Sequence, residues 1–179
     1  MAFRRSKKTY DEAGLYEYAV GALGRRMRSV AELKRLLRQR PLTEPHRAEA
    51  LIDAVINRLK DQRYLNDSQY AAAYSSYRRD NEKFGRMRVI NELKTRGVHG
   101  DVIDKAVGAA YADVNDESQA RDFLRRKRLA KPSNQKQAAR IFRTLMRAGF
   151  RSKVIFAILK KWDVEEEVLT ALDTEAEPD

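Results

Sequence analysis

The sequence contains no cysteine, and only eight glycines and four prolines occur among its 179 residues. Without cysteine the chain forms no disulfide, carries no nucleophilic thiolate and offers no thiolate ligand to zinc. Runs of alternating β-branched residues, which would indicate strands, are also missing. A chain with few helix breakers and many helix-forming residues is expected to be ordered and helical.

Long apolar segments are absent as well. No stretch approaches the 18 consecutive apolar residues that indicate a membrane-spanning helix. The start, "MAFRRSKKTYDEA", is basic but lacks the apolar segment of a secretory signal peptide after it. We therefore expect a cytoplasmic protein without a membrane partner.

Positive charge is the most unusual property of the composition. The formal net charge is +11 and the isoelectric point is near 9.9, which favours an anionic partner: nucleic acid, an anionic membrane or an acidic protein surface. The charge is distributed unevenly. Residues 119–153 hold twelve Lys or Arg and the single acid Asp122, whereas residues 163–179 hold eight acids and no base.

Apolar residues spaced three and four apart mark one buried face of a helix, and they recur along the chain. They predict a first helix over about 11–24. The segment "SVAE" (29–32) has the form of a capping box that starts a second helix, which Pro41 stops. A third helix is predicted between Ala48 and Leu59.

The next segments repeat this arrangement, with residues 67–112 again predicted as three helices. Asp67 and Asp101 are expected to cap helices, and Gly97 is expected to end one in the left-handed conformation. Ser133 is a further expected N-cap in a third set of three helices. A short helical appendix around Val168 precedes "DTEAEPD" (173–179), which is expected to be disordered.

Comparable positions recur about every 50 residues. One is occupied by Leu33, Val89 and Ile141, and the other by Leu37, Leu93 and Leu145. Small units of this kind gain stability by stacking on their neighbours, although any helical chain also produces accidental matches. The pattern predicts an all-α fold of three tandem three-helix repeats, over residues 11–66, 67–114 and 115–163, between a basic N-terminal segment (1–10) and an acidic C-terminal tail (164–179).

No group of residues predicts catalysis. His46 and His99 lie in predicted loops without a partner at metal-ligand spacing, and no nucleophile, phosphate-loop or dinucleotide motif occurs. Asp61 and Asp104, with the two expected capping aspartates, could in principle hold a metal, but capping is the simpler explanation. We therefore expect no catalytic residue, no cofactor and no metal; an unrecognised enzyme is the least favoured hypothesis.

The basic residues are the best candidates for contact with a partner. Residues 25–40 include seven basic residues and one acidic residue. Farther along the chain, "RRKR" (125–128) precedes three arginines that are spaced three and four apart on one helix face, Arg140, Arg143 and Arg147. Such a face binds a phosphate backbone or an acidic protein groove. An ordinary solvated helix surface is the alternative. Tyr70, Tyr74 and Tyr77 could stack bases, but their spacing also fits a core, which we favour.

Three segments together resemble the RecX family, bacterial regulators that bind the RecA recombinase. "SVAELKRLL" (29–37) resembles the family's SxxELxxKL run. "VINRLKDQRYLND" (55–67), before "QYAAAY", resembles its helix ending in GYLDD, and "FGRMRVINELKTRGV" (84–98), before "IDKAV", its GxxxIxxELxxKGI pattern. Arg63 and Asn66 depart from that GYLDD turn, and "RQRPL" (38–42) stands where the other two units have a glycine.

The resemblance covers about residues 14–162 and implies nine helices in three units, forming an elongated, curved right-handed-helix array that lies in the groove of a RecA filament on single-stranded DNA. It implies a monomer that modulates, and most often inhibits, the ATPase, recombinase and SOS coprotease activities of RecA. Direct DNA contact is also possible, and a general nucleic-acid-binding helical repeat is the alternative function. The candidate contact residues are Arg25, Arg26, Arg28, Lys94, Arg96, Arg125, Arg126, Lys127, Arg128, Arg140, Arg143 and Arg147.

Overall fold

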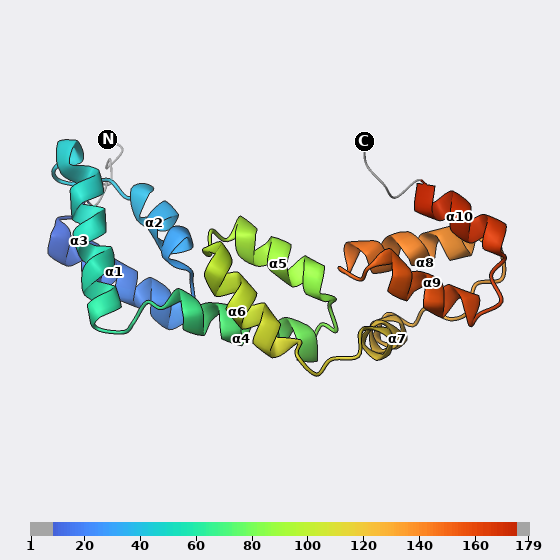
Figure 1. Ribbon diagram of the computed structural model, residues 1–179. Helices are drawn as coiled ribbons and strands as arrows, with labels where there is room; N and C mark the ends of the chain where they lie inside the picture. The colour runs from blue at the N-terminus through green and yellow to red at the C-terminus, as the bar shows by residue number, and fades with distance from the viewer. Residues whose placement is uncertain (1–8, 175–179) are drawn as a thin grey trace, which may run out of the picture.

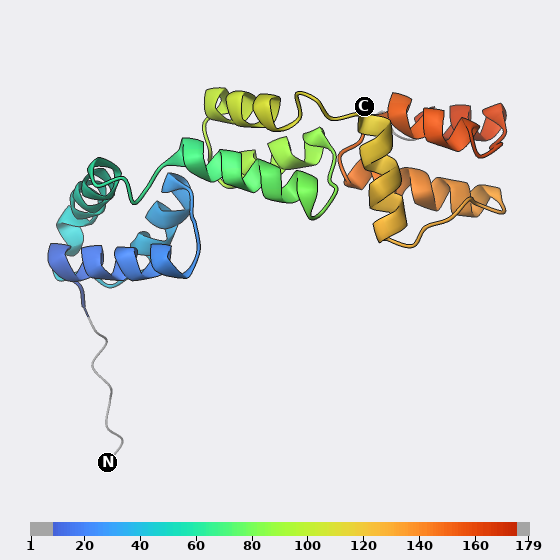
Figure 2. The same cartoon turned by 90° about the horizontal axis from the view of Figure 1, so that it is seen from below.

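The structure is a computed structural model that describes residues 9–174. Within that range the chain forms ten α-helices, one short 3-10 helix and one isolated bridge between Tyr10 and Leu42, and no strand. Figures 1 and 2 show three groups of helices following one another along an elongated molecule. Residues 1–8 of the expected basic segment (1–10) and residues 175–179 of the expected acidic tail (164–179) lie outside the described residues.

The first unit consists of α1 (Glu12–Arg25), α2 (Val30–Arg38) and α3 (Ala48–Asp61), with the 3-10 turn η1 (Pro45–Arg47) before α3. The predicted capping box is confirmed: the Ser29 hydroxyl accepts from the Glu32 amide at 3.0 Å, and the Glu32 carboxylate accepts from the Ser29 amide at 3.1 Å. Leu33 and Leu37 are fully buried in a core that the three helices share. The apolar spacing therefore predicted these helices and their inner faces correctly.

The second unit consists of α4 (Asp67–Asp80), α5 (Arg86–Thr95) and α6 (Gly100–Ala110). Two capping predictions were wrong here. Asn66, not Asp67, caps α4, because its side chain accepts from the amides of Ser68 and Gln69. Asp101 lies inside the first turn of α6, which has no side-chain cap. Asp67 is used elsewhere: its carboxylate accepts from the Val30 amide at 2.8 Å, across the boundary to the first unit.

The third unit consists of α7 (Asp116–Arg126), α8 (Gln135–Arg147) and α9 (Ser152–Lys160), and α10 (Glu166–Thr174) packs against α8 and α9. Asn134 caps α8 in place of the predicted Ser133, because its side chain accepts from the Gln137 amide at 2.9 Å. The predicted appendix is α10, on which Leu169 is buried; it also includes Asp173 and Thr174, which were wrongly expected to be disordered. The described chain thus has a tenth helix beyond the nine that three units supply.

Left-handed residues end several helices. Gly97 and Gly149 have φ of 75° and 89° after α5 and α8, as predicted for Gly97 from its place at the helix end. Arg63 replaces the glycine expected after α3 and still adopts φ of 61°. The amide of the next residue, Tyr64, donates to the Leu59 carbonyl at 2.9 Å, so the turn keeps its hydrogen bonds without glycine.

The second helices of the three units form a row in the order α2, α5, α8 (Figure 1). At the first joint, the start of α2 meets the end of α5: the Ser29 hydroxyl donates to the Arg96 carbonyl at 2.6 Å, and a Cβ added to Gly97 would lie 2.5 Å from the Ala31 Cβ. Glycine is therefore needed there for close approach as well as for its φ.

At the second joint, the start of α5 meets the end of α8 in the same head-to-tail way. The Gly85 amide donates to the Ala148 carbonyl at 2.8 Å and the Met87 amide to the Gly149 carbonyl at 3.3 Å, so helix ends that would otherwise lack partners satisfy one another. A side chain at Gly85 would collide with backbone atoms of Gly149, and one at Gly149 with backbone atoms of Arg88. Among residues 9–174, no helix begins against the end of α2 in this way, so the "RQRPL" segment needs no glycine for a close approach.

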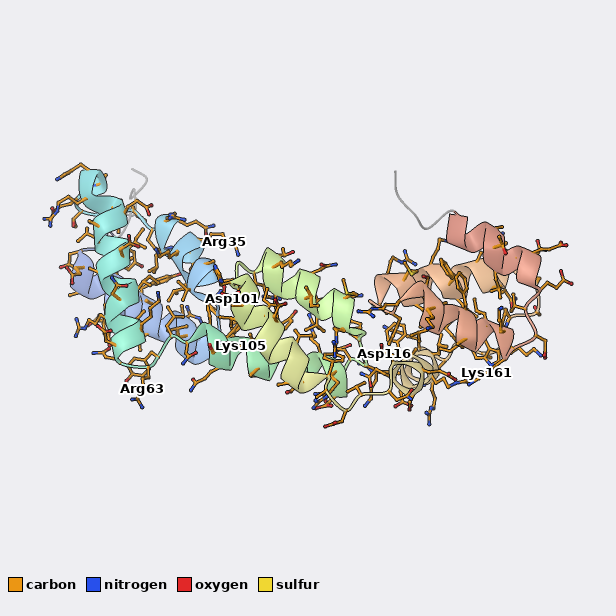
Figure 3. All side chains as sticks on the ribbon, in the orientation of Figure 1. Arg35, Arg63, Asp101, Lys105, Asp116 and Lys161 are labelled. Atoms are coloured by element: carbon orange, nitrogen blue, oxygen red, sulfur yellow. The ribbon has the colours of Figure 1, made fainter. Side chains whose placement is uncertain are left out.

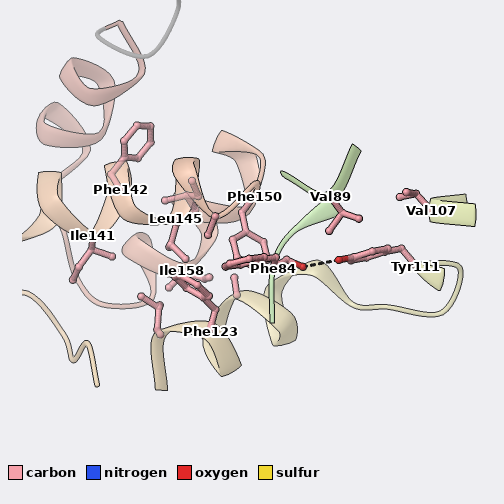
Figure 4. Packing of buried hydrophobic residues seen from close by; sticks show 14 of the residues in the cluster. Phe84, Val89, Val107, Tyr111, Phe123, Ile141, Phe142, Leu145, Phe150 and Ile158 are labelled. Carbon is pink, nitrogen blue, oxygen red and sulfur yellow. Dashed lines mark hydrogen bonds between the residues drawn. The ribbon is translucent and has the colours of Figure 1, made fainter. Parts of the chain in front are cut away.

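The two joints divide the core unequally. Buried residues of the second and third units form one continuous cluster, whereas those of the first unit form a separate cluster. Figure 4 shows Phe84, from the loop before α5, packed among residues of the third unit. Its ring centroid lies 6.0 Å from that of Phe123, and its carbonyl accepts from the Tyr111 hydroxyl at 2.8 Å.

Candidate partner-binding groove

A groove of about 660 Å³ follows the row of second helices, with α5 at its centre. One end is formed by α2 and the other by the end of α8, so all three units contribute to it. Its lining is formed by Glu32, Arg35, Arg78, Met87, Arg88, Asn91, Glu92, Thr95, Arg96, Met146, Arg147 and Gly149. Five arginines and two glutamates give this lining a net positive charge.

Three of the arginines pair with the two glutamates. Arg96 Nη1 lies 2.6 Å from Glu32 Oε1, while the Nε atoms of Arg78 and Arg88 each lie 3.0 Å from oxygens of Glu92. Only 12% of the Glu32 side chain and 22% of the Glu92 side chain are exposed, so these pairs are weakly screened by solvent. They hold the middle of the groove in a fixed arrangement.

Aromatic rings pack against the guanidinium groups of these arginines. The guanidinium carbons of Arg78 and Arg96 lie 4.9 and 4.8 Å from the centre of the Tyr74 ring, and that of Arg88 lies 3.9 Å from the Phe84 ring. Such contacts restrain an arginine without using its hydrogen-bond donors for a carboxylate. Burial raises the pKa of the neighbouring Tyr70 to about 12, with Glu32 adding to the shift, so its phenol stays neutral.

The two remaining arginines lie at opposite ends of the groove. Arg35 on α2 is exposed and its Nη2 donates to the Thr95 carbonyl at 3.4 Å (Figure 3 shows it between α2 and α5). Arg147 on α8 is exposed, and its carbonyl accepts from Arg88 Nη1 at 3.2 Å. Among the residues that the structure describes, neither guanidinium has an ion pair with a carboxylate. Both retain donors for an anionic ligand.

Methionines supply the apolar part of the lining. Met87 is 41% exposed, which makes it one of four large apolar side chains exposed among the described residues, and Met146 is half-buried. An unbranched, flexible thioether side chain adapts to apolar partners of different shape. The groove therefore offers an adaptable apolar surface at its α8 end, beside Arg147, and a second cationic end at Arg35.

Three of the sequence-predicted contact residues lie near this groove. Arg96 and Arg147 line it, and Arg96 is half-buried against Glu32 and Tyr74. It is held there because its guanidinium crosses the first joint. Lys94 is exposed on the last turn of α5 but does not line the groove.

The predicted cluster at residues 25–28 lies beside the first joint. Arg25 and Arg26 are exposed, and Arg26 Nη2 lies 4.0 Å from Glu32 Oε1. Arg28 is half-buried, and its Nε donates to the Ala22 carbonyl at 3.5 Å. These residues therefore extend the positive surface next to the α2 end of the groove.

The remaining candidates lie elsewhere in the third unit. Arg125, Arg126, Lys127 and Arg128 are exposed at the end of α7, where Arg125 pairs with Asp122 and Arg126 Nη1 lies 2.6 Å from Glu82 Oε2. Arg140 and Arg143 are exposed on α8, as predicted, although only Arg147 of that face lines the groove. The structure thus separates the predicted basic residues into more than one surface.

Several groove residues were not selected from the sequence. Arg78, Arg88 and Met87 were overlooked because single basic residues between apolar helix positions look like ordinary surface. The tyrosines were predicted only in part: Tyr70 is buried and Tyr74 is half-buried, but Tyr77 is 54% exposed. The sequence signal for these residues was the methionine between two arginines in "GRMR" (85–88).

The described residues contain neither a metal-binding cluster nor a membrane-spanning helix. Among residues 9–174, no group of three or more His, Cys, Asp or Glu is placed to hold a metal ion. His99 is an exposed loop residue 3.7 Å from Asp101. No helix within the described chain is long and apolar enough to cross a bilayer.

The fold and the groove define a class of protein: an all-helical repeat protein with a cationic groove. A family model described as "RecX, second three-helix domain" matches residues 66–107. Regulatory protein RecX from Leptothrix cholodnii is 33% identical over 150 residues, which cover 83% of this chain and 89% of that protein. The chain therefore belongs to the RecX family of regulatory proteins.

Other relatives agree with this assignment. Regulatory protein RecX from Bacillus subtilis is 30% identical over 165 residues, covering 90% of this chain. The crystal structure of RecX from Lactobacillus salivarius covers 85% of this chain and 96% of that one, with a TM-score of 0.62 and 21% identity, and shows the same fold. The chain spans 58% of the length of the B. subtilis protein and 54% of that from Oceanobacillus iheyensis.

Proposed function

We propose that the chain binds the RecA recombinase, either free or as a filament on single-stranded DNA, and inhibits its ATPase, recombinase and SOS coprotease activities. The observation that carries this proposal is the match to RecX regulatory proteins over most of the chain. The elongated row of units suits binding along a filament, because one molecule can contact more than one protomer. No step of this role requires a catalytic residue in the chain.

Electrostatics supports the same role. The net charge of +11 favours association with a nucleoprotein filament, whose DNA is a dense array of negative charges. The groove and the other basic surfaces described above offer arginine guanidinium groups, which bind carboxylates and phosphates with paired hydrogen bonds. We propose that binding uses these surfaces and that the units hold them in register.

A direct assay tests the proposal. The purified chain is added to RecA filaments preformed on single-stranded DNA, and ATP hydrolysis and strand exchange are followed. We expect both rates to fall as the chain approaches a stoichiometric ratio to RecA. Unchanged hydrolysis and unchanged strand exchange at that ratio would refute the proposed function.

A second candidate function is direct binding of nucleic acid through residues 125–128. The exposure of all four bases at the end of α7 favours it. Phosphate binding weakens steeply with salt, by roughly one power of salt concentration for each phosphate contacted. Binding to bare single-stranded DNA with that salt dependence, together with no effect on RecA, would favour the second candidate over the first.

A further inference from the structure

The lining of the groove combines features that suit a protein ligand better than a nucleic acid. Glu32 and Glu92 lie among the arginines, and a phosphate backbone passing over them would meet two carboxylates. The methionines offer no donor to a phosphate, but they contact apolar side chains well. Donors that remain for a ligand are concentrated at the two ends, on Arg35 and Arg147.

We propose that this groove binds an extended acidic segment of a partner protein that carries one apolar side chain. The apolar side chain contacts Met87 and Met146 at the α8 end of the groove, an acidic side chain beside it binds Arg147, and an acidic side chain toward the other end of the segment binds Arg35. Arg78, Arg88 and Arg96 remain paired with the two glutamates and shape the centre. In identifying the partner as RecA the inference rests on the proposed function, whereas the chemical class of the ligand does not.

The size of the groove sets the length of the segment. Helix α5 has 10 residues and therefore extends about 15 Å at a rise of about 1.5 Å per residue. An extended peptide advances about 3.3 Å per residue, so about five residues lie along α5. An apolar residue near one end of the segment, with an acidic residue beside it and another toward the far end, matches the methionines next to Arg147 and the more distant Arg35.

The joints make this ligand site dependent on all three units. Arg35 belongs to the first unit, the methionines to the second and third, and Arg147 to the third. Because each joint fixes the end of one second helix against the start of another, the two end arginines keep their places relative to α5. A ligand that contacts both ends is therefore selected by charge and by length.

The absence of cysteine allows a single reactive position to be introduced. Met87→Cys carries a benzophenone maleimide into the groove, and Tyr64→Cys places the same group on a matched control side chain, 59% exposed, in the turn after α3. Figure 3 shows its neighbour Arg63 at the edge of the first unit, far from Arg35. Each labelled protein is irradiated with RecA filaments on fluorescent single-stranded DNA.

We expect position 87 to form adducts with RecA protein and to form several-fold fewer with DNA, and position 64 to form several-fold fewer with RecA. Adducts mainly with DNA from position 87 would overturn the proposal in favour of a nucleic-acid ligand. Equal yields from the two positions would overturn it as well. If ATP hydrolysis by RecA is inhibited but position 87 forms no adduct, the groove is not the binding site, whereas the proposed function stands.

Charge reversal supplies a second test. Arg35→Glu combined with Arg147→Glu is compared with Lys105→Glu combined with Lys153→Glu, which changes net charge equally at exposed positions outside the groove. Circular dichroism verifies that both variants remain helical. We expect the groove variant to bind filaments on the order of tenfold more weakly and the control to change far less. Equal losses would point to general electrostatic attraction and overturn the proposal.

A third test does not depend on RecA. The ¹⁵N-labelled chain is titrated with a blocked pentapeptide of four acidic residues and one leucine next to a terminal residue, and separately with pentathymidylate. We expect saturable amide shifts along α5 with the peptide, and weaker shifts when serine replaces the leucine. Shifts with pentathymidylate alone, or none along α5 at millimolar peptide, would contradict the ligand class even if inhibition of RecA were observed.

Discussion

The two joints of this protein have the same geometry but different chemistry. At the first joint the contacts are polar: Ser29, the N-cap of α2, and Glu32 bind the end of α5, and Asp67 binds the start of α2. At the second joint Phe84 enters the core of the third unit, and apolar residues on both sides form one cluster. Repeated units can therefore be linked weakly or strongly without any change in the path of the chain.

This difference predicts how the molecule comes apart. Burial of apolar surface is the main favourable term in folding, so units that share a core are expected to unfold together. Polar contacts contribute less net free energy, because water replaces them when they break. We therefore expect the first unit to open independently and the second and third units to behave as one body.

The largest effect is expected from Phe84→Ala. Removing a buried phenylalanine ring costs roughly 3–5 kcal/mol, and this ring links the second and third units. Urea unfolding followed by circular dichroism should show lower stability and separate transitions for these two units. Phe142→Ala, which removes a buried ring within the third unit, is the control. It should destabilise that unit without separating it from the second; separate transitions in both variants would contradict the role of Phe84.

Gly97→Ala should cost slightly less, about 2–5 kcal/mol. Roughly 1–2 kcal/mol comes from the left-handed conformation and roughly 1–3 kcal/mol from collision with the Ala31 Cβ. Adding Ala31→Gly should recover the collision part, because the other atom involved is then removed. Thermal unfolding of the single and double variants measures the recovery.

The corresponding change at the second joint, Gly149→Ala, gives the contrast. Its Cβ would meet the backbone of Arg88 as well as the side chain, so truncating that side chain cannot remove the collision. We therefore expect Arg88→Gly to recover less stability in the Gly149→Ala variant than Ala31→Gly recovers in the Gly97→Ala variant. Equal recoveries would contradict this difference between the two close contacts.

A smaller loss is expected from Glu32→Gln at the first joint. The carboxylate accepts from the Ser29 amide and pairs with Arg96, and hydrogen bonds to charged groups contribute about 1.5–3 kcal/mol. The variant should lower the protection of α1 to α3 against hydrogen exchange and leave that of α7 to α9 unchanged. Equal loss of protection in both regions would mean that the first joint does not uncouple the units.

The smallest effect concerns pH and Asp67. Burial raises the pKa of Asp67 above its usual value, although the Val30 amide acts in the opposite direction. A raised pKa in the folded state means that the contribution of this group to stability is largest below the ordinary pKa of about 3.9 and decreases as pH rises through the folded value.

Asp67→Asn removes that titration and can still accept from the Val30 amide. From pH 4 to pH 7 the free energy of unfolding of the variant should therefore rise relative to that of the original chain, by less than about 1 kcal/mol. Urea unfolding of both proteins at the two pH values measures the difference. If the variant is instead more stable relative to the original chain at pH 4 than at pH 7, folding favours the ionised carboxylate of Asp67.

Much of the fold could be predicted from the sequence because local rules determine it. Buried positions such as Leu93 and Leu145 follow helical spacing, and the capping box at Ser29 and the turn at Gly97 depend on nearby residues alone. The misassigned caps have a different cause. Asp67 was expected to cap its own helix, but a contact 37 residues away with Val30 uses its carboxylate, and such contacts leave no local pattern.

The groove was less accessible to prediction for the same reason. Its residues come from three units, and the sequence shows only that each unit has basic positions. Arg96 and Arg140 look alike in the sequence, yet the first crosses a joint and the second is exposed on α8. Chemistry that arises from how units meet becomes visible only when the units are placed together.

Native-state hydrogen exchange at increasing urea tests the central claim most directly, because it measures the opening free energy of each unit in the intact chain. The account predicts that amides in α1 to α3 lose protection at lower urea, while those in α4 to α6 and α7 to α9 lose it together at higher urea. A single shared opening for all three units, or loss of the third unit before the second, would contradict it.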